Sequence, residues 1–145
     1  MEIIYKHTQI GYVIISVFLF ILFLFVPIFT QNINKPIPTI VLIAFIAIFF
    51  LFPTLTVTVN KEKINLAFGI GLIKKNFNIT EIDSFTKVKN PWIYGWGIHY
   101  TPDGWLYNVS GFNAIEIKLK SGKKYRIGTD EPSQLFDAIA SAVDK

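Results

Sequence analysis

Residues able to carry acid–base or nucleophilic chemistry are few in this sequence and lie far apart. The 145 residues include no cysteine and two histidines, His7 and His99, which excludes disulfides, thiolate metal sites and a cysteine nucleophile. Asp103 is a conceivable general base beside His99, but Pro-Asp-Gly is first a turn sequence whose carboxylate accepts local backbone hydrogen bonds. No phosphate-binding glycine loop, zinc-ligand spacing or Ser-His-Asp arrangement is present. We therefore predict no catalytic residue, no metal site, no cofactor and no enzymatic activity.

The stretch from Pro91 to Phe112 is unusual because it contains all three tryptophans together with four glycines. One interpretation is a binding surface built of aromatic rings. The other is the core of a small domain, where large rings usually pack while glycines permit bends. Both interpretations remain open from the sequence. The residues that would form the candidate partner surface are Trp92, Tyr94, Trp96, His99, Trp105 and Tyr107.

Two long apolar runs precede this region and would position the rest of the chain. Residues 10–29 and 37–53 contain no Asp, Glu, Lys or Arg, and each run is about as long as a bilayer core of roughly 30 Å requires of a helix. We predict that residues 1–53 form a transmembrane helical hairpin. Met1–Gln9 is interpreted as a short amphipathic lead, because it lacks the basic region and cleavage site of a signal peptide.

The distribution of lysine around the two runs bears on orientation. Lys6 precedes the first run and Lys35 lies alone in the connector. Four more follow the second run, namely Lys61, Lys63, Lys74 and Lys75. Positive residues favour the cytoplasmic side, so we predict a multi-pass protein of the cytoplasmic (inner) membrane with both termini cytoplasmic. The formal charge of +4 is scattered, which favours an anionic membrane surface over nucleic acid as a partner.

Residues 54–145 read as a β domain with one C-terminal helix. Apolar and polar residues alternate with period two in most of the predicted strands, which is typical of half-buried strands. The segment 82–88 is a weaker strand signal, and the turn sequence Pro102-Asp103-Gly104 predicts that 97–101 pairs with 105–109. The predicted strands are 55–59, 64–68, 73–79, 82–88, 97–101, 105–109, 115–119 and 125–127. Thr129 to Pro132 supplies a cap and a first-turn proline, and the apolar spacing after it predicts a helix over about 132–144.

The number of residues in the turn decides the register of the last predicted hairpin. A two-residue turn would place Arg126 among apolar residues, because a shift of one residue moves every side chain to the other face. A three-residue loop with Gly122 in the left-handed conformation instead pairs Ile117 with Tyr125 and Ile115 with Ile127. It also sets Glu116 opposite Arg126.

Strand hairpins followed by one amphipathic helix, behind a two-helix anchor, resemble the bacterial pleckstrin-homology-like (PH-like) membrane proteins. The clearest pieces are Leu55 to Gly71, which resembles their opening hairpin, and Glu116 to Lys123, which resembles their last hairpin. The resemblance implies an α+β, mainly β fold over 54–145, a bent antiparallel sandwich or barrel with one open end capped by the helix. Such domains usually have seven strands, so Ile98 to Val109 would be an inserted hairpin.

These features predict a non-catalytic, membrane-integral interaction module. Its expected partner is another protein or a second copy of the chain, bound through a sheet edge or through the aromatic stretch. The alternatives are a lipid-facing module that binds anionic headgroups and a small bracing subunit of a larger membrane complex. A first strand leading out from the membrane and a second leading back would bring an apolar turn to the bilayer. The candidate membrane-contact residues are Ile70, Leu72, Ile73, Lys74 and Lys75.

Overall fold

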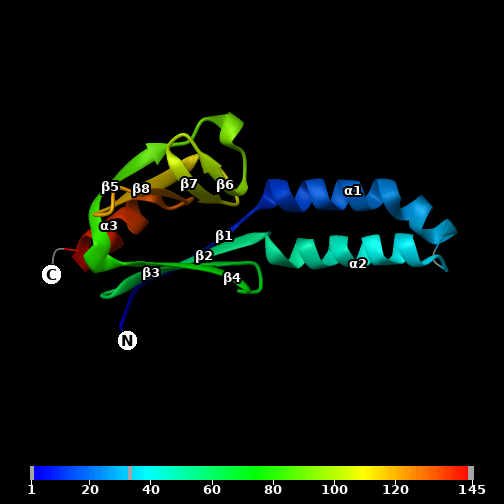
Figure 1. The fold of residues 1–145 in the computed structure, drawn as a ribbon, viewed down its shortest axis with the longest axis horizontal. Coiled ribbons are helices and arrows are strands. Elements are labelled where there is room, and N and C mark those ends of the chain that lie inside the picture. The colour runs from blue at the N-terminus through cyan, green and yellow to red at the C-terminus, as the bar shows by residue number, and fades with distance from the viewer. Residues whose placement is uncertain (1, 33, 144–145) are drawn as a thin grey trace.

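Two β-sheets and three α-helices are present in the computed structural model, which describes residues 2–32 and 34–143 (Figure 1). The protein is therefore α+β, as predicted, and its C-terminal helix, α3 (Pro132–Val143), is confirmed. The predicted end of that helix at residue 144 lies outside the described residues. Figure 1 shows a β domain from which two long helices project side by side.

The first sheet has four antiparallel strands in the order β1-β2-β3-β4. Its strands are β1 (Ile3–Ile10), β2 (Thr54–Asn60), β3 (Lys63–Phe68) and β4 (Ile73–Asn78). The alternation that predicted β2 and β3 is confirmed. In each strand every second side chain faces the core and is buried, namely Leu55, Val57 and Val59 in β2 and Ile64, Leu66 and Phe68 in β3. Asn60 closes their turn by accepting hydrogen bonds from the backbone N–H groups of Glu62 and Lys63.

The prediction of an amphipathic lead at Met1–Gln9 is wrong, because strand β1 occupies most of it. β1 pairs with β2 from Ile10 opposite Thr54 to Ile3 opposite Asn60. Apolar residues gather at its ends rather than alternate, and as an edge strand it is only partly buried. Its partner lies beyond both helices. The helical hairpin is therefore inserted between two neighbouring strands of one sheet.

The two projecting helices are α1 (Tyr12–Gln31) and α2 (Pro36–Leu51). Phe18 of α1 packs on Phe45 and Phe49 of α2, with ring centroids 4.7 and 5.6 Å apart, yet neither helix has a buried residue. By length and apolar composition α1 alone of the described helices is sufficient to cross a membrane, while α2 is a shorter apolar helix of 16 residues. α1 starts later than predicted because Ile10 is still in β1.

The second sheet has five strands in the order β5-β8-β9-β7-β6. They are β5 (Ile82–Lys89), β6 (Gly97–Thr101), β7 (Gly104–Asn108), β8 (Asn113–Leu119) and β9 (Lys124–Gly128). The predicted register is confirmed: Ile117 is opposite Tyr125, and Gly122 has a φ of 83°. The prediction of an entirely antiparallel fold is wrong for one strand pair. β7 and β9 pair in parallel. After β7 the chain crosses to β8, on the far side of β9, and then returns through an antiparallel hairpin to β9, which therefore runs in the same direction as β7.

The core lies between the two sheets and is closed on one side by α3. Leu135 and Ile139 of this helix are fully buried, and Phe136 packs on Phe85 of β5 with ring centroids 4.9 Å apart. The helix contacts β1, β2, β5 and β8. The opposite side, between β4 and the β6–β7 edge, has no such cover among the described residues.

β1 is fastened to the start of α3 by polar contacts. The Tyr5 hydroxyl donates a hydrogen bond to Glu131 Oε2 at 3.1 Å, and His7 Nε2 lies 2.8 Å from Asp130 Oδ1. Burial, together with the hydrogen bond to the Glu131 carboxylate, raises the pKa of Tyr5. The folded state therefore holds this phenol in its neutral form.

We expect Tyr5→Phe to flatten the alkaline limb of the stability profile. A tyrosine whose pKa is raised by folding contributes stability that is complete below its unfolded pKa of about 10 and is lost as pH rises above it. Thermal unfolding in one detergent, followed between pH 8 and pH 11, should show a smaller loss of stability in Tyr5→Phe than in the unmodified protein. Tyr12→Phe, at an exposed position, is the control. Parallel profiles for Tyr5→Phe and the unmodified protein would contradict the assignment.

Candidate functional site

The β3–β4 turn, predicted to contact the membrane, lies against the end of α2. Gly69 N–H donates to the Thr54 carbonyl at 2.9 Å, and Ile70 N–H donates to the Phe50 carbonyl at 3.3 Å. The side chains of Ile70 and Leu72 are 66% and 73% exposed. This places two large apolar side chains in solvent-accessible positions beside the apolar surface of the helices.

The other three residues of the predicted membrane contact are placed differently from one another. Ile73 is partly buried against the core, and Lys74 is exposed next to the turn. Lys75 points away from the turn, because its Nζ lies 5.7 Å from the ring centroid of Phe77 and 5.4 Å from that of Tyr125. Lys75 thus contributes its charge to the gap between the sheets rather than to the turn.

The six residues of the predicted partner surface do not form one surface. Tyr107 is buried in the core between Phe77 and Tyr125, and burial raises its pKa. Trp92 is 79% exposed in the short helix η2 (Trp92–Tyr94). Both interpretations that the sequence left open are therefore correct for part of the stretch: Tyr107 belongs to the core and Trp92 to the surface.

Two further rings of that stretch, those of Trp96 and His99, are partly buried on the second sheet. Trp96 packs beside Phe112, with ring centroids 6.3 Å apart. The Trp96 Nε1 and His99 Nε2 atoms are buried and make no hydrogen bond to the described part of the chain. Asp103 does not act as a base for His99, because its carboxylate is engaged by other residues, Tyr94 and Arg126, through a hydrogen bond and an ion pair.

Those other residues form a polar network around Arg126, the sole arginine of the sequence. Arg126 Nε donates to Glu116 Oε2 at 2.8 Å, and its Nη1 lies 3.0 Å from Asp103 Oδ2 and 3.2 Å from Asn90 Oδ1. The Tyr94 hydroxyl donates to Asp103 Oδ2 at 2.9 Å, which raises the pKa of Tyr94. The network holds the segment between β5 and β6 on the face of the second sheet that is turned away from the core.

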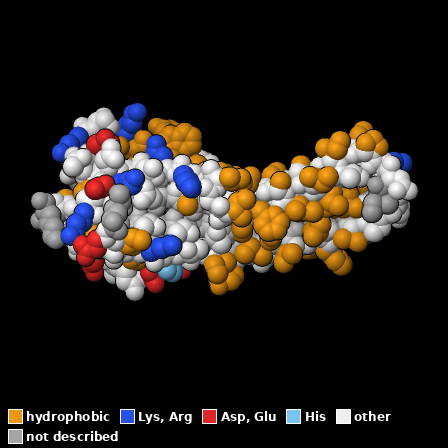
Figure 2. Space-filling model, turned by 90° about the horizontal axis from the view of Figure 1, so that it is seen from below, with side chains coloured by type: hydrophobic (Ala, Val, Ile, Leu, Met, Phe, Trp, Pro, Cys, Tyr) orange, Lys and Arg blue, Asp and Glu red, His pale blue; other side chains and the backbone are white. Residues whose placement is uncertain are grey.

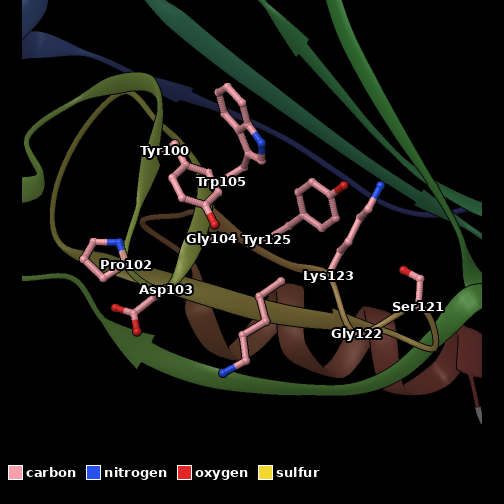
Figure 3. Close-up of a pocket in the computed structure, with 10 residues that line it drawn as sticks. Tyr100, Pro102, Asp103, Gly104, Trp105, Ser121, Gly122, Lys123 and Tyr125 are labelled. Carbon is pink, nitrogen blue, oxygen red and sulfur yellow. The ribbon is translucent and has the colours of Figure 1, made fainter.

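A concave region of the β domain lies at its open side, remote from the helices. It is a shallow cleft of about 580 Å³. Its lining comes from the β6–β7 and β8–β9 turns and from aromatic side chains of three strands, chiefly Tyr100, Trp105 and Tyr125. Tyr100 and Trp105 meet edge to face, with centroids 5.7 Å apart. In Figure 3, Trp105, Tyr125 and Lys123 point toward the strands of the first sheet, whereas Asp103 points the other way.

This chain matches no protein-family model, no curated protein and no solved structure. Within the described residues, no group of three His, Asp or Glu side chains is placed to hold a metal ion.

Sequence reasoning missed Asn90 as a partner of the arginine and Tyr125 as a wall of the cleft. A signal for the network was available, because an arginine between two apolar strand residues is seldom buried without charged or polar partners. The predicted register had already placed Glu116 opposite Arg126. The contacts to Asn90 and Asp103 come from loops whose positions alternation does not specify.

Proposed function

We propose that this protein is a non-catalytic, membrane-anchored interaction module of PH-like fold that binds an extended segment of a partner protein. The observation that carries the proposal is the aromatic cleft beside β6. β6 is the last strand of its sheet, so one of its edges has no strand neighbour among the described residues. An exposed edge can accept an added strand, with neighbouring pockets selecting the side chains of that strand.

The anchor is proposed from the exposure of α1 and α2. Both are predominantly apolar, carry no charge and have no buried residue. In water such a surface is unfavourable, whereas in hydrocarbon a helix satisfies its own backbone groups. A helix of 20 residues rises about 30 Å and one of 16 residues about 24 Å, so α2 would cross with a local mismatch that bilayers accommodate.

The membrane would be the cytoplasmic (inner) one, crossed twice. The first and last described elements, β1 and α3, both belong to the β domain (Figure 1), so a double crossing leaves both termini on one side. The excess of lysine in that domain favours the cytoplasm. The PH-like assignment rests on the two sheets and on the C-terminal helix that covers one side of the core.

The test is photocrosslinking of the full chain in native membranes from a photoreactive residue placed at Ser121, on the rim of the cleft. Placement at Asp137, exposed on α3, is the matched control. We expect a discrete protein adduct from Ser121 and none of that size from Asp137.

Trp105→Ala should abolish the Ser121 adduct while the thermal unfolding temperature stays close to that of the unmodified protein, because Trp105 is partly exposed. A large apolar ring in a binding cleft contributes a disproportionate share of affinity. Adducts of equal yield from Ser121 with and without Trp105, or lipid adducts alone, would contradict a protein-binding cleft.

A further inference from the structure

The turns at the two ends of the β domain differ in chemistry. At the end remote from the helices the β2–β3, β6–β7 and β8–β9 turns contain Lys61, Glu62, Asp103, Lys120 and Lys123. At the other end, residues 69–72, 90–96 and 109–112 contain no charged residue at all. The apolar residues of these three segments include Ile70, Leu72, Trp92, Ile93 and Phe112, all exposed.

Backbone contacts place these three segments around the base of the helices. The β3–β4 turn touches the end of α2, as described above. The Gln9 side chain, just before α1, donates from Nε2 to the Ser110 carbonyl at 3.0 Å. The Phe112 carbonyl in turn accepts a hydrogen bond from Asn90 N–H at 2.7 Å, which brings the start of the 90–96 segment to the same end.

The two most exposed apolar sites lie on different sides of the helical pair. In Figure 1 the β3–β4 turn lies on the α2 side, and the segment between β5 and β6 rises on the α1 side. Figure 2 shows charged side chains gathered on the part of the domain remote from the helices. On that face, hydrophobic side chains cover the helices and continue onto the adjoining end of the domain.

The exposure of Trp92 and Ile93 is enforced rather than accidental. Asn90 and Tyr94, on either side of them, belong to the Arg126–Asp103 network. Gly95 then ends the short helix with a φ of 61°. A segment fixed at both ends holds its intervening side chains outward, at 79% and 72% exposure.

We propose that Trp92 and Ile93 form a second membrane contact, which rests in the headgroup layer of an anionic bilayer together with the β3–β4 turn. The inference rests on the proposed anchoring by α1 and α2. Tryptophan favours this layer because its ring is amphipathic. Two exposed lysines, Lys74 beside the turn and Lys89 at the end of β5, are placed to meet anionic headgroups, which attract basic residues. Contacts on both sides of the helical pair would fix the tilt of the domain, with its cleft facing away from the bilayer.

Intrinsic fluorescence of three full-length forms tests the contact. The first keeps Trp92 and carries Trp96→Phe and Trp105→Phe, and the second keeps Trp105 and carries Trp92→Phe and Trp96→Phe. The third carries all three Trp→Phe changes together with Val17→Trp, at an exposed position of α1. Each is reconstituted into anionic vesicles made with or without lipids brominated on the acyl chain close to the headgroup.

We expect brominated lipid to quench Trp92 and the tryptophan introduced at position 17, and to leave Trp105 unchanged. Iodide in the buffer should quench Trp105 and spare Trp92. Quenching at position 17 without quenching of Trp92 would overturn the second contact while leaving the anchor intact. No quenching at either position would overturn both the contact and the anchor. Equal quenching of Trp92 and Trp105 would overturn the fixed tilt, and with it the proposed arrangement.

Discussion

Arg126→Met should lower the free energy of unfolding by about 3 kcal/mol, because removing the main partner of a largely buried carboxylate leaves its charge poorly compensated. The side chain of Arg126 is 10% exposed and that of Glu116 is 14% exposed, so the carboxylate left behind has little access to water. It retains a longer contact, 3.4 Å, to the more exposed Lys124. Asn90 and Asp103 lose the same partner at once. The loss should therefore also release the 90–96 segment from the second sheet.

Chemical unfolding of the full chain in one detergent would measure the change. Lys118→Met is the matched control, since Lys118 lies two residues from Glu116 on β8 and pairs with Asp83 at 3.2 Å on the exposed surface. An exposed pair of this kind contributes about 1 kcal/mol or less. Adding Glu116→Met to Arg126→Met should restore part of the stability, because the poorly compensated carboxylate is then removed. Equal losses for Arg126→Met and Lys118→Met would show that the network does not stabilise the fold.

Gly69→Ala should cost about 3 kcal/mol and Gly71→Ala about 1 kcal/mol, because left-handed backbone alone costs an alanine roughly 1–2 kcal/mol and a forced approach of backbone adds roughly 1–3 kcal/mol. Both glycines have positive φ, 50° and 84°. A Cβ at Gly69 would collide with the backbone of Phe50 and Leu51 at the end of α2. A Cβ at Gly71 would meet only the end of the Lys74 side chain, at 3.7 Å.

The difference between these two variants measures how tightly the turn and the helix are held together. Thermal unfolding in detergent gives the stability of each. Limited proteolysis after α2 then reports whether the helix end has separated from the sheet. If the two variants lose the same stability, the close approach of Gly69 to α2 contributes nothing beyond the backbone conformation.

Local pattern predicted the elements whose partners are near in sequence. Alternation and turn sequences located the strands from β2 to β9, and the alternation around the Gly122 loop fixed the pairing of Ile117 with Tyr125. The apolar spacing after Thr129 located α3. In each case the buried face repeats within a few residues, so the pattern and the structure have the same physical origin.

What the sequence did not predict depends on contacts between distant segments. β1 lacks a clear alternation and finds its partner only beyond two helices. The positions of the rings of residues 92–96 follow from a loop that is held by Arg126 and its partners, and a loop has no period from which direction can be predicted. The exposed Ile70–Leu72 turn was predictable because both strands that lead to it alternate.

Because the helices interrupt the ladder between β1 and β2, synthesis imposes an order on folding. β1 leaves the ribosome first, but Thr54 emerges more than forty residues after Ile10, a delay of seconds at about 5–20 residues per second. The first sheet can close only when both helices have been made and have turned back on themselves. A nick in the connector between α1 and α2 would cut the chain without freeing either half, since the β1–β2 ladder would still join them.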